Sequence, residues 1–154
     1  MSLEELIASL KNGPGLQRAR SAQELGRMKD RRAVSPLIAA LGDKNSAVRN
    51  NAAYALAELG ASEAVPAVVK LLGDPEEWVR KSAAKSLGIL RARSALSDLI
   101  KALDDDSYMV RKNVARSLGQ IGGEEARKAL ERAAADPDLV VSHTAREALE
   151  KLEA

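Results

Sequence analysis

Residues Ala64–Gly88 read AVPAVVKLLGDPEEWVRKSAAKSLG, and this stretch decides the fold. Apolar residues recur at helical spacing on both sides of the central Gly-Asp-Pro, which predicts a short helix over 63–72 and a longer one over 75–90. Asp74 is expected to cap the longer helix, with Pro75 at its first position and Glu77 at its third. The stretch therefore predicts two helices joined by a tight turn.

The same pattern recurs along the chain at a step of 31 residues. On the longer helix the step connects Leu25, Leu56, Leu87, Leu118 and Leu149, and on the shorter one it connects Leu37, Val68, Leu99 and Leu130. Ten helices are predicted in a single domain over residues 1–154. We divide it into an N-terminal half repeat over 1–17, repeats over 18–48, 49–79, 80–110 and 111–141, and a C-terminal capping helix over 142–154.

These segments resemble HEAT repeats of the short phycobilisome-lyase type, which are also the template of artificial alpha-repeat binders. The resemblance covers essentially the whole chain. It implies an all-α fold, a right-handed α-solenoid (a HEAT-like superhelix) with ten helices in five stacked layers. Arrays of this kind serve many partners, so the resemblance implies a fold more sharply than a function.

The composition excludes several classes of protein. The chain has 154 residues and no Cys, which rules out a disulfide scaffold. Its 24 Lys and Arg are nearly balanced by 22 Asp and Glu, and the net charge of +2 disfavours a nucleic-acid-binding protein. The first residues are acidic where a signal peptide is basic, and no apolar run approaches the roughly 20 residues of a membrane span. We expect a soluble cytoplasmic protein that does not bind membranes.

Catalytic motifs are absent from the sequence. His143 is the single His, so neither a Cys–His pair nor a multi-His metal site can be assembled in one chain, and we expect this side chain to face solvent. The acidic run 104–106 is interpreted as a helix cap. We therefore expect a noncatalytic protein without a metal or another cofactor.

Three glycines lie inside the predicted longer helices, at Gly26, Gly88 and Gly119. A glycine inside a helix costs about 0.5–1 kcal/mol relative to alanine. We expect close contact with a neighbouring helix at each of them.

A charged pair recurs once per unit, with an aspartate at the turn and an arginine six residues later. We interpret the pairs as a structural ladder that joins adjacent loops, and not as a charged binding stripe, because repetition in register suits a scaffold. The ladder is expected to stop at Asp136, which meets Ser142, and at Arg18, which follows Asn12. The pairs are Asp43 with Arg49, Asp74 with Arg80, and Asp105 with Arg111.

The longer helix, which carries the Val-Arg dipeptide, lines the concave side in arrays of the family that the chain resembles. All three aromatic residues of the chain lie on this helix type, at positions expected to point outward beside Lys, Arg and Asn. The candidate partner-binding residues are Asn50, Tyr54, Trp78, Lys81, Lys85, Tyr108, Met109, Lys112 and Arg116, and the outward set also includes Asn51, Ser82 and Asn113. Two interpretations remain open: a binding groove centred on Trp78, or apolar cover for the seams between helices.

The leading functional hypothesis is a monomeric, noncatalytic scaffold that binds a partner protein or peptide on its concave face. The basic candidates favour a partner with an acidic surface. Glu58 and Glu77 interrupt the basic residues, which makes nucleic-acid binding the weaker hypothesis. The alternative, a phycobilin lyase-like subunit or a chaperone of a chromophorylated protein, follows from the resemblance alone.

Overall fold

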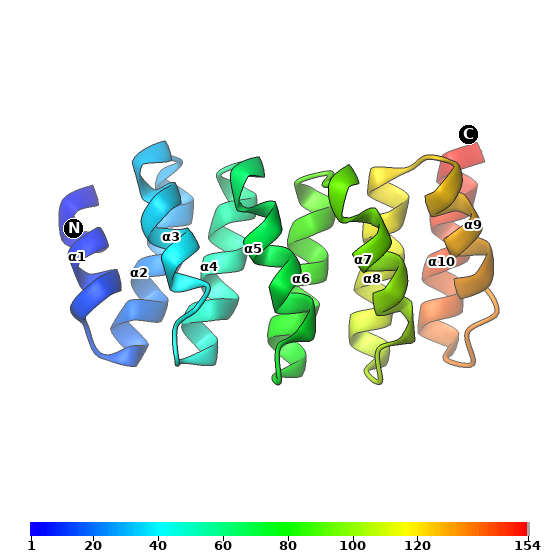
Figure 1. The fold of residues 1–154 in the computed structure, drawn as a ribbon, viewed down its shortest axis with the longest axis horizontal. Helices are drawn as coiled ribbons and strands as arrows, with labels where there is room; N and C mark the ends of the chain where they lie inside the picture. Colours follow the sequence, from blue (N-terminus) through cyan, green and yellow to red (C-terminus); the bar gives the residue numbers. More distant parts are fainter. Residues whose placement is uncertain (154) are drawn as a thin grey trace.

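Ten α-helices form an elongated array in a computed structural model that describes residues 1–153 (Figure 1). The described residues contain no strand, so the predicted all-α solenoid of ten helices is confirmed. None of these helices is long and apolar enough to cross a bilayer. The helices are α1 (Leu3–Asn12), α2 (Gly15–Met28), α3 (Val34–Ala40), α4 (Ser46–Glu58), α5 (Val65–Lys70), α6 (Glu77–Ile89), α7 (Leu96–Lys101), α8 (Tyr108–Ile121), α9 (Glu124–Ala133) and α10 (Leu139–Glu153).

The helices stand in two rows. The odd-numbered helices form the row nearer the viewer in Figure 1, and the even-numbered helices form the row behind it. Each even-numbered helix packs on the next even-numbered helix and on the odd-numbered helix of its own pair. We call the outer surface of α2, α4, α6, α8 and α10 the even-helix face. It is the side that the resemblance to HEAT repeats implies to be concave.

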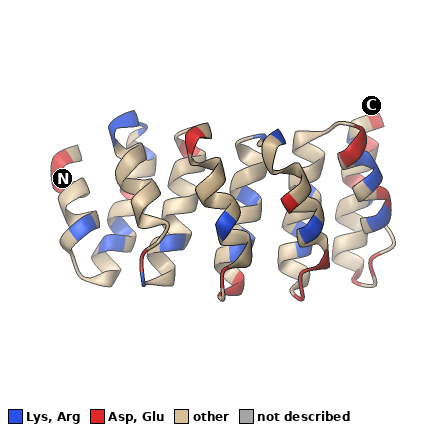
Figure 2. Cartoon of the chain, viewed as in Figure 1, with Lys and Arg blue, Asp and Glu red and all other residues tan. Residues whose placement is uncertain are grey.

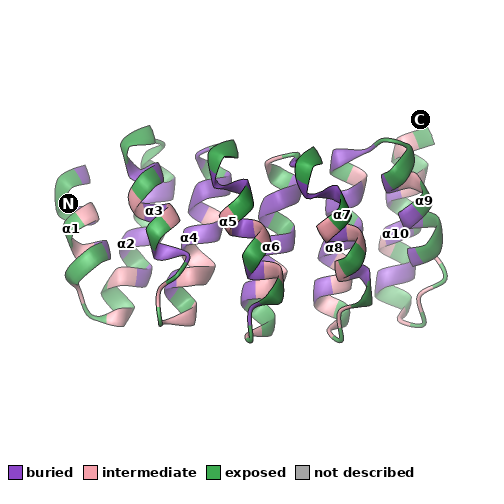
Figure 3. Cartoon of the chain, viewed as in Figure 1, coloured by how far each residue is buried: buried purple, intermediate pink, exposed green. Residues whose placement is uncertain are grey.

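The core lies between the two rows, as the purple bands in Figure 3 show. Leu25, Leu56, Leu87 and Leu118 are fully buried on the even-numbered helices, and their partners at the same step on the odd-numbered helices are fully buried too. Burying one such side chain contributes about 1.5–3 kcal/mol. Because a single pair cannot bury this face alone, stacking of neighbouring pairs stabilises the array.

The three glycines lie where neighbouring even-numbered helices come closest. A Cβ added to Gly26 would lie 2.7 Å from the Cα of Ala55 on α4, and one added to Gly119 would lie 2.8 Å from the Cβ of Ala148 on α10. A Cβ on Gly88 would lie 2.7 Å from the Cβ of Ser117 on α8. The predicted close contact is confirmed at all three positions.

The even-numbered helices begin later than predicted. Asp74 does not cap α6, because its carboxylate accepts a hydrogen bond from the backbone N–H of Glu76 at 2.9 Å and the helix begins only after Glu76, at Glu77. The capping position is Glu76 and its counterparts at the 31-residue step. Side chains cap the helix there at Asn45, Ser107 and Asp138.

The internal odd-numbered helices α3, α5 and α7 are shorter than predicted, with 3-10 turns beside them. α5 occupies only Val65–Lys70 of the predicted span 63–72, and short 3-10 turns flank it at Ser62–Ala64 and Leu71–Gly73.

The acidic run 104–106 does not cap a helix, contrary to the prediction. Ser107 caps α8, and Asp105 pairs with Arg80.

Candidate interaction surface

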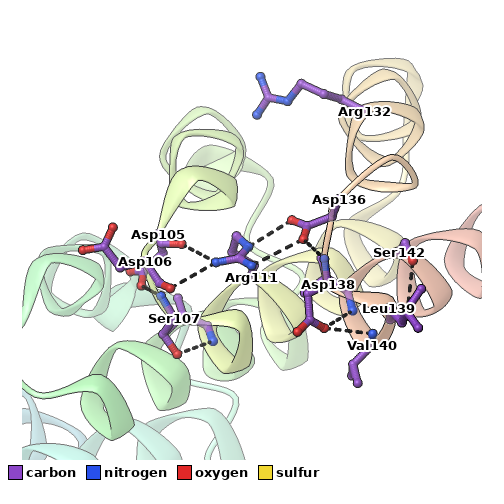
Figure 4. A network of polar contacts seen from close by, with 12 residues as sticks. Asp105, Asp106, Ser107, Arg111, Arg132, Asp136, Asp138, Leu139, Val140 and Ser142 are labelled. Carbon is purple, nitrogen blue, oxygen red and sulfur yellow. Dashed lines mark hydrogen bonds and ion pairs between the residues drawn. The ribbon is translucent and has the colours of Figure 1, made fainter.

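A ladder of arginines joins the loops that precede the even-numbered helices. Figure 4 shows one rung, in which Arg111 lies between two aspartates of successive loops. Its Nη1 donates to the backbone carbonyl of Asp105 at 2.8 Å, and its Nε lies 2.9 Å from the carboxylate of Asp136. One guanidinium thus links its own loop to the next.

The structure contains a ladder of aspartates and arginines, but the ion pairs join different residues from those predicted. Arg49 does not pair with the carboxylate of Asp43; it donates to the Asp43 carbonyl oxygen at 2.8 Å and forms an ion pair with Asp74 at 2.8 Å. The reason is that each Asp carboxylate accepts the N–H two residues later in its own loop and faces the arginine of the preceding even-numbered helix, 25 residues earlier. Arg80 likewise pairs with Asp105 and not with Asp74.

The ladder also extends further than predicted. Arg18 pairs with Asp43 at 2.9 Å, and it donates to the carbonyl of Gly13 where the other arginines use an aspartate carbonyl. At the other end Asp136 is held by Arg111, so neither of the expected stops breaks a rung. Every interface between successive even-numbered helices therefore carries one rung.

The rungs are largely buried and bidentate. The hydrogen bond from Arg18 holds the pKa of the Asp43 carboxyl below its ordinary value, and the Asn45 N–H acts in the same direction. In turn, hydrogen bonds to Asp74 and Asp105 raise the pKa values of Arg49 and Arg80. Two parallel N–H···O bonds to a carboxylate fix the relative position of the two loops.

The even-helix face carries most of the candidate binding residues in accessible positions. Trp78 at the start of α6 is 49% exposed and Tyr108 at the start of α8 is 44% exposed. Lys85 and Arg116 are exposed, whereas the side chains of five candidates are half-buried: Asn50, Tyr54, Lys81, Met109 and Lys112. Ser82 and Asn113, which were expected to point outward, are buried.

Small polar side chains close the seams between the even-numbered helices. The Ser82 hydroxyl donates to the side-chain oxygen of Asn50, and the Asn51 amide donates to the carbonyl of Ala19 at 2.8 Å. The Asn113 amide donates to the carbonyl of Met109 on its own helix at 2.8 Å. Asn50 is thus part of a seam between α4 and α6, and its polar groups are engaged within the protein.

Tyr54 and Lys85 meet across the same seam. The Lys85 ammonium lies 5.4 Å from the centre of the Tyr54 ring, which is within cation–π range. Both residues line a hollow of about 280 Å³ that also includes Glu58 and Ile89.

An apolar row crosses the even-helix face near the starts of the helices. Trp78, Met109 and Val140 share one position at the 31-residue step, and Leu16 occupies it on α2 with 65% of its surface exposed. Leu139 beside Val140 is 80% exposed. Sequence reasoning did not assign Leu16 to the binding surface, although the repeat step carried back from Trp78 would have found it.

Basic residues follow the apolar row along the face. Within residues 1–153 no carboxylate lies within ion-pair distance of Lys81, Lys85, Lys112 or Arg116. Figure 2 shows acidic residues gathered mostly at the helix ends and loops. No cluster of three metal-ligating side chains occurs among the described residues, and His143 is exposed beside Glu147.

The repeat pattern matches an established family. The family model described as HEAT repeats matches residues 3–88 and again 66–150. The chain belongs to the HEAT-repeat family. Among curated proteins, none matches the chain significantly.

Solved structures share the fold over nearly the whole chain. A chain in the structure of the complex of CpcE and CpcF of phycocyanin lyase from a Nostoc species matches with a TM-score of 0.87 and 31% identity. The match covers 99% of the present chain and 65% of the chain in that complex. This chain therefore spans about two thirds of the length of that relative. Computationally designed armadillo repeat proteins for modular peptide recognition match with a TM-score of 0.71 and 25% identity, over 97% of this chain and 81% of theirs.

Proposed function

We propose that this HEAT-repeat chain is a noncatalytic scaffold that binds another protein or a peptide on its even-helix face. The exposure of Trp78 carries the proposal. The chain has three aromatic residues, and the largest of them, Trp78, is half exposed in the middle of the array. It belongs to an apolar row that runs from Leu16 to Val140. Exposed apolar surface with a polar rim marks interaction sites, and Trp is enriched among residues that dominate binding.

The charges beside this row define the partner. Lys81, Lys112 and Arg116 lie next to it, and a partner with acidic side chains would compensate them. Because the array is held by buried leucines and ladder rungs, its surface is formed before binding and little ordering entropy is lost. Two related structures support this use of the fold: one is a complex of two lyase chains, and the other was designed for modular peptide recognition.

The test is a binding measurement with an identified partner. A partner captured from the host lysate and identified by mass spectrometry is purified, and its affinity is measured for the natural chain and for Trp78→Ala. We expect a loss of at least about 2 kcal/mol if Trp78 is the central contact. The matched control is Lys70→Glu on α5, which lies in the odd-numbered row. If Trp78→Ala binds normally and Lys70→Glu does not bind, the binding site lies on the odd-numbered helices and the proposal is wrong.

A second candidate is a phycobilin lyase-like subunit or a chaperone of a chromophorylated protein. The similarity to the phycocyanin lyase structure, at 31% identity, is the observation that favours it. Titration with phycocyanobilin, followed by absorption spectroscopy, distinguishes the two candidates. A spectral change on addition of the chain supports the lyase-like role, and an unchanged spectrum counts against it.

A further inference from the structure

A hollow between α8 and α10 gathers basic side chains from three segments of the chain. Its volume is about 330 Å³, and its basic lining consists of Arg91 from the loop after α6, Arg116 of α8 and Lys151 of α10. The rest of the lining is Gly119, Gln120, Thr144, Glu147 and Ala148. None of these residues except Arg116 was singled out from the sequence as a binding residue.

Small residues give the hollow its depth. Gly119 and Ala148 are in such close contact that a Cβ on Gly119 would lie 2.8 Å from the Cβ of Ala148. The long side chains of Arg116 and Lys151 stand beside these two small residues. The space between them is large enough for a group of several atoms.

The charge in the hollow is not balanced. Glu147 is the single carboxylate of the lining, and it already lies 2.6 Å from His143. Over the part of the chain that the structure describes, Arg116 and Lys151 have no ion-pair partner, and Arg91 donates through Nη1 to the carbonyl of Gln120 at 3.0 Å. Exposed arginines elsewhere, such as Arg27 and Arg31, do pair with a carboxylate. Three cations against one carboxylate leave an excess of two positive charges.

A neighbouring hollow continues this one toward the start of α10. It has a volume of about 560 Å³, shares Arg116, Thr144 and Glu147 with the first, and adds Lys112 and Arg146. The exposed apolar side chains of Leu139 and Val140 also line it. The two hollows together offer a cationic pocket with an apolar approach.

We propose that the hollow between α8 and α10 is a binding site for an oxyanion with at least two negative charges, either a phosphate group or a pair of carboxylates. A guanidinium fork matches both groups geometrically, and a concave cationic surface concentrates anions. The site stands on its own lining.

The experiment is a titration of the full chain, with backbone amide NMR signals as the readout. Pyrophosphate and citrate are the two probes, and sodium chloride at matched ionic strength is the reference. We expect the amides of Gly119, Gln120 and Ala148 to shift with a saturable dependence on at least one probe, while Gly60, far along the array, does not move. A response to pyrophosphate alone assigns a phosphate, and a response to citrate assigns carboxylates; both support the site.

Variants connect the shifts to the hollow. Arg116→Gln and, separately, Lys151→Gln should each weaken binding about tenfold, as the loss of a charge-assisted contact predicts. The matched control Lys70→Gln on α5 should bind as the natural chain does. Because both lining residues are exposed, the circular dichroism of the variants should be unchanged. The proposal is overturned if neither probe shifts these amides, or if both variants bind as tightly as the natural chain. Because the titration uses no partner protein, its failure would not count against the proposed function, and failure of the partner-binding test would not count against this site.

Discussion

The guanidinium of Arg80 connects two loops that are 31 residues apart in the sequence. Its Nη1 donates to the carbonyl of Asp74 at 2.9 Å, and its Nε lies 2.9 Å from the carboxylate of Asp105. Asp74 itself receives Arg49 from the preceding loop. Asp43, Asp74 and Asp105 thus each serve two arginines, one through the side chain and one through the backbone carbonyl.

Replacing Asp74 with Ala should lower the free energy of unfolding by about 1–3 kcal/mol, because it leaves Arg49 largely buried without its carboxylate. Chemical denaturation measures the change. Asp104→Ala is the matched control, since Asp104 is exposed and lies next to the ladder residue Asp105. Equal denaturation midpoints for the two variants would mean that the ladder does not stabilise the fold.

The Asp43–Arg18 rung should make stability depend on pH below neutrality. Because the folded-state pKa of Asp43 is lowered, the pair stabilises the fold fully above the unfolded pKa of about 3.9 and loses that contribution as pH falls through the folded pKa. Asp43→Asn should therefore be less stable than the natural chain at pH 7, and the gap should narrow below about pH 4. Urea unfolding at several pH values measures it. A difference in unfolding free energy between the two proteins that stays constant down to pH 2 would contradict a stabilising Asp43–Arg18 ion pair.

Gly26→Ala should destabilise the array by about 1–3 kcal/mol, because the added methyl group would press on the α4 backbone at Ala55. Gly73→Ala is its control. No atom lies within 4 Å of a Cβ at Gly73, so that change should be neutral or slightly stabilising. Thermal unfolding of the two variants compares them directly, and similar effects would mean that close packing of α2 on α4 does not matter.

Glu76 offers a stabilising substitution. It occupies the capping position of α6 without a side-chain hydrogen bond, whereas Asn45 at the same step caps α4. Glu76→Asn should raise stability by about 0.5–1 kcal/mol, and Asn45→Ala should lower it by about 1 kcal/mol. The pair of denaturation curves tests both signs, and a drop for Glu76→Asn would show that the cap geometry differs between the two helices.

The array was predictable because the leucines that hold it together recur unchanged. Leu56 and Leu87 report the repeat step in the sequence and are fully buried in the structure. The glycine contacts followed from the same step, since a glycine inside a helix needs a compensating contact. These features depend on residue type and periodicity alone.

The ladder pairing and the surface were harder to predict for physical reasons. An arginine six residues after one aspartate lies 25 residues before the next, and only the direction of the side chains decides which carboxylate it meets. Ser82 and Asn113 look like surface residues, yet both are buried, because Ser82 donates to Asn50 across the seam between α4 and α6 and Asn113 donates to the Met109 carbonyl on its own helix. The hollow beside Arg116 depends on Arg91 and Lys151, which are 60 residues apart and share no sequence pattern.

The ladder makes the array extensible. Each 31-residue repeat carries both partners of one ion pair, the arginine at its start and the aspartate 25 residues later, and every ladder arginine after Arg18 also donates to the aspartate carbonyl of the repeat before it. A duplicate of residues 49–79 inserted after Val79 would bring its own ion pair, and its arginine would find the Asp74 carbonyl of the original repeat in place, while the existing ion pairs would keep their partners. Because such units interact mainly with their nearest neighbours, the surface can lengthen by whole units without redesign of the rest. Growth by duplication is therefore open to this chain at every internal boundary.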